Sequence, residues 1–434
     1  MPLPSIVAMI SLLAILASGA WVSLGLMGVG IFSLEIFRSI PVEKLLAQSI
    51  WNGVSSAELL ALPLFILMAE LLFRSRFIDG LFSALEPWVR RLPGGLLHTN
   101  ILACAFFALV SGSSAATTSS VGRITINELD GRGYDRRLTI GTLAGAGTLG
   151  FLIPPSIVMI VYGVLSQTSV LKLFTAGILP GVLLTLCFMG FIAVLAKLRP
   201  NIVPKHTGDN SRIWRERMAG LPALLPFIVL IGSILGSMYG GIASPTEAAA
   251  VAVLVTMVLM ALERSLTWRA LSDAATGTAR TVAMLGLIIA AASFLASAIG
   301  FLGMPQAVSA FINGLNLPPL GLIVLLMVVY IILGSFLEGM SIIVMTIPIV
   351  LPLVVSAGYD KVWFGVFLIL MVELAQISPP VGMNLFVLQG LTREPLTRVV
   401  RAAFPFFIIM LCFVFFLAVF PQVVGLLPGL LQGG

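Results

Sequence analysis

Apolar stretches follow one another along this chain almost without interruption, and no other feature restricts its fold so strongly. Hydrophobic residues make up 59% of the 434 residues and charged residues only 10%, with a mean hydropathy of +1.12. Soluble domains carry about 25% charged residues, so this composition excludes them. Because a transmembrane helix needs about 20 mostly apolar residues, we expect an all-α polytopic membrane protein.

The apolar stretches divide the chain into roughly twelve membrane segments. They lie near residues 4–18, 20–33, 57–73, 101–126, 138–165, 171–197, 221–239, 245–262, 280–300, 320–355, 362–390 and 402–426. Basic residues sit mostly in the short connections, so the net charge of +6 indicates positive-inside topology rather than nucleic-acid binding. No basic residue precedes Arg38, so the first run is expected to be a permanent span and not a secretory signal.

The two halves of the chain share motifs at an offset of 225 residues. Gly-Tyr-Asp at 133–135 recurs at 358–360, and Pro-Pro at 154–155 recurs at 379–380. The same offset superposes three apolar runs of the first half, 57–73, 101–126 and 171–197, on 282–298, 326–351 and 396–422. We interpret this as an internal duplication, with the polar stretch 197–217 as a cytoplasmic linker between the copies.

Basic residues also indicate how the two copies are oriented. Residues 74–137 contain eight of them, whereas the matching stretch 299–362 contains only Lys361. Cytoplasmic loops carry the excess of Lys and Arg, so one copy is predicted to open to the cytoplasm and the other away from it. Inverted repeats of this kind are typical of secondary transporters, which hold substrate near the midplane between the copies.

Two apolar segments have small polar residues at their centres, at 111–114 and at 334–341, and fit poorly as straight helices. If the first crossed the membrane fully, the arginines at 90–91 would lie opposite those at 132–137, contrary to the positive-inside bias. We therefore expect two re-entrant helical hairpins in addition to about ten full spans.

Each copy also has a helix interrupted by two successive prolines. Proline lacks an N–H and clashes with the carbonyl group one turn earlier, so a Pro-Pro pair frees carbonyl oxygens inside the membrane. Such oxygens suit Na⁺, while the N-termini of half-helices suit a carboxylate. An ordinary proline kink is the alternative for one pair alone, but the occurrence of both pairs beside hairpin tips favours two ligand-binding broken helices.

Five segments, taken together and in order, carry a resemblance to a known family. They are LPLFILMAELLFRS (62–75), GGLLHTNILACAFFALVSGSSAATTSSVG (94–122), LIPPSIVMIVYG (152–163), ASPTEAAAVAVL (243–254) and ISPPVGMNLFVLQG (377–390). Over nearly its full length the chain resembles the large, DctM-like membrane subunit of tripartite ATP-independent periplasmic (TRAP) transporters. The resemblance implies an elevator-type fold of the ion-transporter superfamily and Na⁺-driven import of an organic acid, such as a C4-dicarboxylate or a sugar acid, across the bacterial inner membrane. It also implies two partners, a small membrane subunit and a periplasmic substrate-binding protein, and no organic cofactor.

The resemblance further implies that sodium binds where each hairpin tip meets its broken helix. One site maps onto Ser111, Ser113, Ser114, Gly150, Ile153 and Pro154, and the other onto Glu338, Gly339, Ser378, Pro379 and Val381. Substrate is expected between the tips, near Thr117, Ser156, Ser341 and Asn384. Thr117 stands where many members have Asp, Phe151 where proline is common, and Arg123 is unusual in the returning arm, which leaves the substrate class and the number of coupled ions open.

On this plan the chain divides into nine parts. They are scaffold helices (1–73), a cytoplasmic arm (74–100), hairpin 1 with its broken helix (101–165), a span (166–197), the cytoplasmic linker (198–218), scaffold helices (219–300), a periplasmic arm (301–319), hairpin 2 with its broken helix (320–390) and a C-terminal span (391–434). The two parts with hairpins are expected to form the mobile transport domain.

Glutamates within apolar segments are costly to bury and therefore mark candidate functional positions. Glu247 fits a helix-initiating capping box with Ser244, and Glu338 at a hairpin tip is the candidate ion ligand. Glu373 precedes a broken helix, and we expect it to brace freed backbone N–H groups or a polar neighbour. Glu70 lies near the end of an apolar run.

Other classes of function find little support. An intramembrane enzyme needs a nucleophile with a base, or a metal set, and the two histidines, His98 and His206, are isolated in the sequence. No GxxxxGK[ST] phosphate loop exists for an ATP-driven pump. A stand-alone divalent-anion/sodium symporter of the same superfamily remains the alternative transporter, and transport without a binding protein would favour it.

Overall fold

The computed structural model describes residues 3–17, 21–38, 40–200, 203–204, 213–314, 317–380 and 382–431, and the regular elements in these ranges are helices. The first half contains α1 (Leu3–Ala17), α2 (Val22–Phe37), α3 (Val42–Val54), η1 (Ala57–Leu60), α4 (Ala61–Leu72), α5 (Phe77–Val89), α6 (Leu96–Ser111), α7 (Ser114–Gly131), α8 (Arg136–Gly147), η2 (Thr148–Gly150), α9 (Ile157–Ser166) and α10 (Val170–Leu198). The second half contains α11 (Ile213–Tyr239), α12 (Pro245–Leu262), α13 (Trp268–Phe301), α14 (Met304–Gly314), α15 (Pro319–Gly334), α16 (Gly339–Ser356), α17 (Lys361–Gln376), α18 (Met383–Thr392), α19 (Leu396–Val419) and α20 (Gln422–Leu431).

Fewer helices than expected are long enough to span a membrane. Among the described residues, α10, α11, α12, α13, α16 and α19 pass by length and composition, and α3 with α4 is a seventh candidate bent by 59°. The expectation of about ten full spans is therefore too high by this measure. The apolar helices α2, α6, α9, α15 and α18 have only 10–17 residues, because polar tips and proline pairs interrupt several of the runs that sequence alone joins into single segments.

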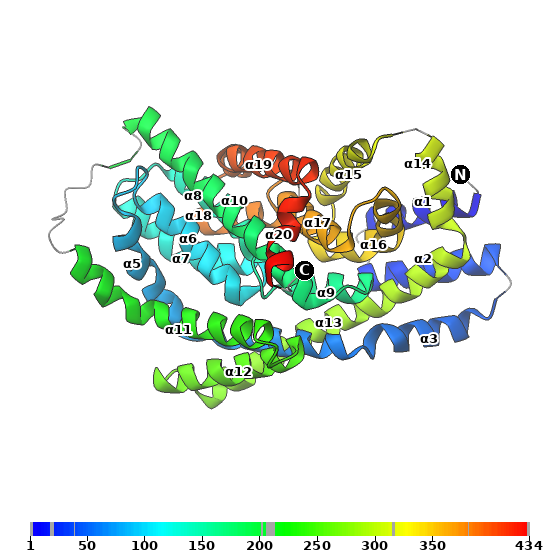
Figure 1. Cartoon of the computed structure of the whole chain (residues 1–434), viewed down its shortest axis with the longest axis horizontal. Helices are drawn as coiled ribbons and strands as arrows, with labels where there is room; N and C mark the ends of the chain where they lie inside the picture. Colours follow the sequence, from blue (N-terminus) through cyan, green and yellow to red (C-terminus); the bar gives the residue numbers. More distant parts are fainter. Residues whose placement is uncertain are drawn as a thin grey trace.

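The helices pack in two groups (Figure 1). In one group α13 lies against α2, α3 and α4, while α12 joins α4 to α11 and α11 packs on α5. In the other group α6, α7 and α8 pack on one another, α18 and α19 cover α7 and α8, and α17 contacts α9, α15, α16 and α19. Contacts of α13 with α16 and of α4 with α9 join the two groups.

The break that the sequence predicts at 111–114 separates α6 from α7. Gly112 adopts a left-handed backbone (φ +55°), which glycine permits without strain, and the Ser113 hydroxyl caps α7 by accepting from the Ala116 N–H at 3.4 Å. The outer ends of the pair lie together, since the Leu96 N–H donates to the Tyr134 hydroxyl at 3.0 Å. We call α6 and α7 hairpin 1.

A second helix pair, α15 and α16, has the same form. Glu338 caps α16 by accepting from the backbone N–H groups of Met340 and Ser341, at 3.0 and 3.3 Å. Pro319 and Tyr359, at the outer ends of the pair, line one cavity and therefore lie at the same end of the molecule. We call this pair hairpin 2.

The helices containing the proline pairs are broken and run in opposite directions. Residues 151–156 separate α8 and η2 from α9, and residues 377–382 separate α17 from α18. Arg136 at the start of α8 donates to the carbonyl of Thr392 at the end of α18 (2.8 Å). Tyr162 in α9 donates to the carbonyl of Lys361 at the start of α17 (2.6 Å), so each broken helix begins where the other ends.

Helix bounds follow the sequence offset closely. Helices α7 and α16 occupy residues 114–131 and 339–356, and α8 and α17 begin at residues 136 and 361. Each of these pairs of bounds differs by the 225 residues that separate the repeated motifs. The repeated local signals therefore start helices at equivalent positions in both halves.

Candidate ion and substrate sites

The tip of hairpin 1 lies directly against the first broken helix. A Cβ atom at Gly150 would lie 2.7 Å from the carbonyl carbon and oxygen of Ser113 and 2.8 Å from the nitrogen of Ser114. A Cβ at Gly112 would lie 3.4 Å from the carbonyl oxygen of Pro155. The hairpin tip and the proline segment thus touch through backbone, and Gly150 leaves the space in which they do so.

Hydroxyl groups close the tip on itself. The hydroxyls of Ser111 and Thr117 lie 2.7 Å apart, and they lie 3.2 and 2.8 Å from the carbonyl oxygen of Ser113, respectively. Thr117 is fully buried. The polar side chains at this tip therefore converge on a few oxygen atoms, which is the donor chemistry of a hard cation.

Glu373 connects the two halves of the molecule at this tip. The side chain is fully buried in α17, and one carboxyl oxygen accepts from the Phe151 N–H at 2.6 Å. The other oxygen lies 2.5 Å from the Ser114 hydroxyl. The expectation that Glu373 braces a freed backbone N–H and a polar neighbour is confirmed.

The contacts of the Ser114 hydroxyl favour a neutral carboxyl group at Glu373. The hydroxyl has one proton and lies 2.9 Å from the carbonyl of Gly147, which can only accept. If Ser114 donates to Gly147, the short contact to Glu373 requires a proton on the carboxyl group. All the contacts of Ser114 are satisfied together when Glu373 is neutral.

Asn384, placed near substrate by the resemblance, belongs to this cluster. Its amide nitrogen lies 3.4 Å from the Ser114 hydroxyl, and its amide oxygen is buried without a partner among the described residues. The Thr118 hydroxyl is also buried and unpartnered there, and a Cβ on Gly147 would lie 1.9 Å from it. The second broken helix, through α18, therefore completes the polar surroundings of hairpin 1.

The tip of hairpin 2 is arranged differently. A Cβ on Gly339 would lie 2.5 Å from Val372 and 3.0 Å from the Gln376 amide, so this tip packs on the end of α17. Ser378 is buried and donates to the carbonyl of Ala375 at 3.1 Å, whereas Pro379 and Glu338 are exposed. Val381 lies outside the described residues.

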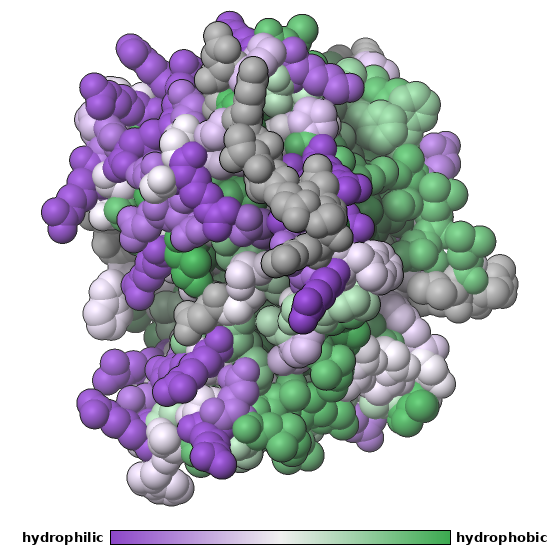
Figure 2. All heavy atoms as spheres, turned by 90° about the vertical axis from the view of Figure 1, so that its left-hand side faces the viewer, coloured by the Kyte–Doolittle hydropathy of each residue, from purple (hydrophilic) through white to green (hydrophobic). Residues whose placement is uncertain are grey.

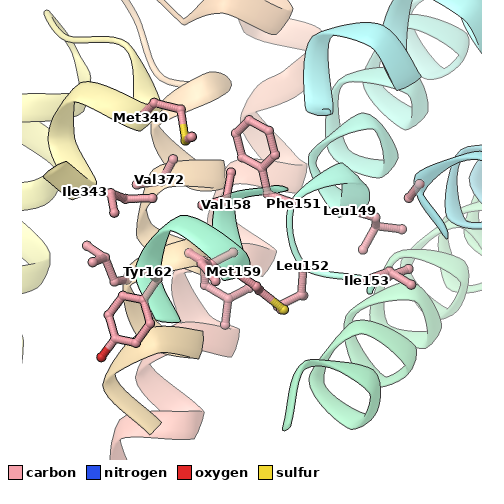
Figure 3. Packing of buried hydrophobic residues seen from close by; sticks show 14 of the residues in the cluster. Leu149, Phe151, Leu152, Ile153, Val158, Met159, Tyr162, Met340, Ile343 and Val372 are labelled. Atoms are coloured by element: carbon pink, nitrogen blue, oxygen red, sulfur yellow. The ribbon is translucent and has the colours of Figure 1, made fainter. Parts of the chain in front are cut away.

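The two tips share one cavity of about 290 Å³. Hairpin 1 contributes 111–113 and Ala116, and hairpin 2 contributes Glu338 and Met340. Glu70 of α4 and Thr281 of α13 close the cavity from the other group of helices. Figure 3 shows Phe151 of the first broken helix near Met340 and Val372, and Phe151 also lines the cavity.

The sequence-predicted residues divide between the cavity and the buried structure around it. Ser111, Ser113 and Glu338 line the cavity, whereas Thr117, Ser156, Ser341 and Asn384 are buried and do not. Ser156 caps α9 by accepting from the Met159 N–H, and the Ser341 hydroxyl lies 3.4 Å from Glu338. Pro154 and Ile153 are buried beside the first tip.

The cavity also contains Glu70, whose place the sequence indicates only in part, and Thr281, which it does not indicate. Sequence reasoning noted Glu70 as a carboxylate in an apolar segment without linking it to a tip, and it gave no signal for Thr281. Both lie far in sequence from the hairpins, and their place depends on how α4 and α13 pack. Arg123 is exposed and does not line the cavity, and Ser244 with Glu247 forms the expected capping box.

Paired hairpins, opposed broken helices and a cavity shared by the two tips define a polytopic α-helical transporter fold. The fold is similar to that of the YdaH transporter from Alcanivorax borkumensis, with a TM-score of 0.64 at 14% identity over 96% of this chain and 98% of that one. MtrF from Neisseria gonorrhoeae gives a TM-score of 0.54 at 13% identity over 96% of this chain and 94% of its own.

The chain belongs to the DctM component family of tripartite ATP-independent periplasmic transporters, whose family model matches residues 6–423. It is 34% identical to the C4-dicarboxylate TRAP transporter large permease protein DctM of Pseudomonas aeruginosa, over 94% of this chain and 93% of that protein. It is 31% identical to the ectoine/5-hydroxyectoine large permease UehC of Ruegeria pomeroyi (90% of each chain) and 28% identical to the sialic acid large permease SiaM of Vibrio cholerae (97% of each).

Membership makes the chain a TRAP large permease subunit, a multi-pass protein of the bacterial inner membrane. The family consists of transporter permeases and not of enzymes. Its members work with a small membrane subunit and a periplasmic binding protein.

Proposed function

We propose that this permease imports a small organic acid together with Na⁺ by an elevator mechanism. The observation that carries the proposal is the cavity shared by the two hairpin tips, which is walled by α4 and α13 on its other side. A ligand held between the tips contacts hairpin 1 and hairpin 2 at once. Movement of that group past α4 and α13 would carry the ligand across the membrane.

Helix ends around the cavity favour this pair of ligands. Helices α7 and α16 begin at Ser114 and Gly339, so both tips present helix N-termini, which attract a carboxylate. The same cavity contains Glu70 and Glu338. Arg74 already pairs with Glu70, but Glu338 has no ion pair among the described residues. An organic anion beside Glu338 needs a compensating cation, and we propose that sodium supplies it at the oxygen-rich tips.

The proposed substrate is a small carboxylate, such as a C4-dicarboxylate or a sugar acid. The relatives are named for C4-dicarboxylates, ectoine, sialic acid and 2,3-diketo-L-gulonate. A cavity of about 290 Å³ is near the lower end of the range for small-molecule pockets. It therefore favours the smaller of these acids.

The inverted repeat is proposed from the opposed broken helices and the unequal charge of the two Gly-Tyr-Asp turns. Single cysteines at Ser211 and Gly358 test it in a cysteine-free background, with membrane-impermeant labelling of intact and opened cells. We expect Ser211→Cys to react only from the cytoplasm and Gly358→Cys only from the periplasm. Labelling of both from the same face would contradict the inverted arrangement.

Sodium coupling is tested first by thermal unfolding of the purified chain in NaCl and in KCl at equal ionic strength. A ligand that binds only the folded state stabilises it by about 2.7 kcal/mol at a hundredfold excess over its Kd. We expect a Na⁺-specific rise in Tm. Equal Tm values in the two salts would argue against the tip sites.

Transport assays in proteoliposomes then test the whole assignment. The permease with its small subunit should accumulate the acid only when a sodium gradient and the periplasmic binding protein are both supplied. Uptake by the permease without any binding protein would instead identify a stand-alone symporter.

A further inference from the structure

Four arginines line a second cavity, of about 320 Å³, which shares no lining residue with the cavity at the hairpin tips. Its lining consists of residues from the start of α8, the loop before α19 and the first turns of α19, namely Arg136, Arg137, Ile140, Glu394, Arg398 and Arg401. The lining thus carries four positive charges against one carboxylate. Figure 2 shows the end of the molecule that carries α8 and α18, where hydrophilic residues gather beside hydrophobic ones.

Internal pairing accounts for only part of this charge. Glu394 pairs with Arg136 and with Arg398, both at 3.0 Å, and Arg136 also pairs with Asp130. Arg137 and Arg401 form no ion pair within the described part of the chain, although Arg137 donates to the carbonyl of Arg401 at 3.2 Å. Two exposed arginines that have no ion pair among the described residues therefore line the same cavity.

The position of the cavity relative to α19 indicates the kind of anion. Helix α19 is a candidate membrane span, and Arg398 and Arg401 lie in its first two turns, where basic residues meet lipid headgroups. Phe404, Ile408 and Phe415 follow Arg401 on the same helical face and are exposed (58%, 39% and 45%). An apolar surface thus continues directly from the charged cavity into the membrane.

We propose that this cavity binds the phosphate headgroup of an anionic phospholipid whose acyl chains lie along the exposed face of α19. The headgroup is held by Arg137 and Arg401, with Arg136 and Arg398 kept in place by Glu394. Because α8 belongs to the first half of the chain and α19 to the second, the lipid ties the two halves together at the cytoplasmic end.

Native mass spectrometry of the full-length protein, with added phosphatidylglycerol or phosphatidylcholine, tests this site. The variants are Arg137→Gln/Arg401→Gln and, as a matched control, Arg91→Gln, which removes an exposed arginine outside the cavity. A basic residue near an anionic membrane surface contributes about fivefold to binding, so the double variant should bind phosphatidylglycerol about 25-fold more weakly. The control should stay within about twofold of the wild type.

Additional measurements establish whether the variant is folded and whether the bound phosphate belongs to a lipid. Thermal unfolding without added lipid establishes that the double variant is folded, and Arg137→Lys/Arg401→Lys should restore most of the affinity. Unchanged phosphatidylglycerol affinity in the glutamine variant, or equal binding of phosphatidylcholine by the wild type, would overturn the proposal. Displacement of the lipid by millimolar inorganic phosphate would overturn the lipid as the occupant and indicate a free anion.

Discussion

The two hairpin tips arise from equivalent positions of the chain, yet their surroundings differ. The first tip is buried among hydroxyls, a carboxyl group and an amide from both halves, including Ser114, Glu373 and Asn384. The second tip packs on Val372 and the Gln376 amide of α17, and its glutamate, Glu338, is exposed and caps its own helix. The comparison teaches that repeated local structure sets the shape of a tip, whereas contacts with distant helices set its polarity.

Substitution of Glu373 is expected to give the largest difference in folding free energy between the two tips. Glu373→Ala leaves the buried Phe151 N–H without a partner, removes one partner of the Ser114 hydroxyl and opens a cavity, so we expect a loss of about 3 kcal/mol of folding free energy. Glu373→Gln keeps an acceptor for Phe151 and a donor for Ser114, and it should cost less than about 1 kcal/mol if Glu373 is neutral. Thermal unfolding of both variants in detergent measures this, with Glu338→Ala, expected to lose about 1 kcal/mol, as the control at the second tip.

A Glu373→Gln variant as unstable as Glu373→Ala would show that the carboxyl group is ionised. The proton assignment of the Ser114 network would then be wrong.

Gly150 tests the backbone contact at the first tip. Gly150→Ala places a Cβ within 2.8 Å of main-chain atoms of Ser113 and Ser114, which cannot move without opening the tip. We expect a loss of about 1–3 kcal/mol and of most of the transport activity. Gly286→Ala, at a helical glycine with nothing within 4 Å of the added Cβ, should keep both stability and transport.

Serine-to-alanine variants at the two tips test whether both tips bind sodium. Ser113→Ala and Ser378→Ala should each raise the sodium concentration needed for half-maximal transport by about fivefold, since one ligand oxygen contributes on the order of 1 kcal/mol. Transport assayed over a sodium series measures this shift, with Ser211→Ala in the polar linker as the control. Unchanged sodium dependence in both tip variants would remove the site assignment.

The smallest expected effect is a pH dependence of stability at the first Gly-Tyr-Asp turn, where Glu394 pairs with Arg136. Hydrogen bonding from Arg398, with further pairing to Arg136, lowers the pKa of Glu394 beside the first turn. A carboxyl group with a lowered folded-state pKa stabilises the fold above its ordinary value of about 4.3 and loses this contribution as pH falls through the folded-state pKa. Acidification from about pH 6 to pH 4 should therefore lower the Tm of the wild type slightly more than that of Glu394→Gln. Equal decreases would show that this pairing does not contribute to stability.

Sequence reasoning succeeded where the signal is local. The break at Gly112, the cap Ser244 and the interruption at Pro154 each follow from the chemistry of neighbouring residues. The number of membrane-length helices did not follow, because hydropathy joins short helices across their breaks. The sequence predicts that Glu373 contacts a backbone N–H group or a polar side chain, but it does not predict that these belong to Phe151 and Ser114.

By itself, the sequence determined that this chain is an all-α membrane transporter with two hairpins and two proline-broken helices. Hydropathy, proline and glycine act over a few residues, so their effects can be read in order along the chain. Tertiary structure alone decided that Glu70 and Thr281 face the hairpin tips and that Asn384 approaches Ser114 across 270 residues. Such neighbours depend on how whole helices pack, and the pattern of residues within one helix carries no record of which distant helix lies beside it.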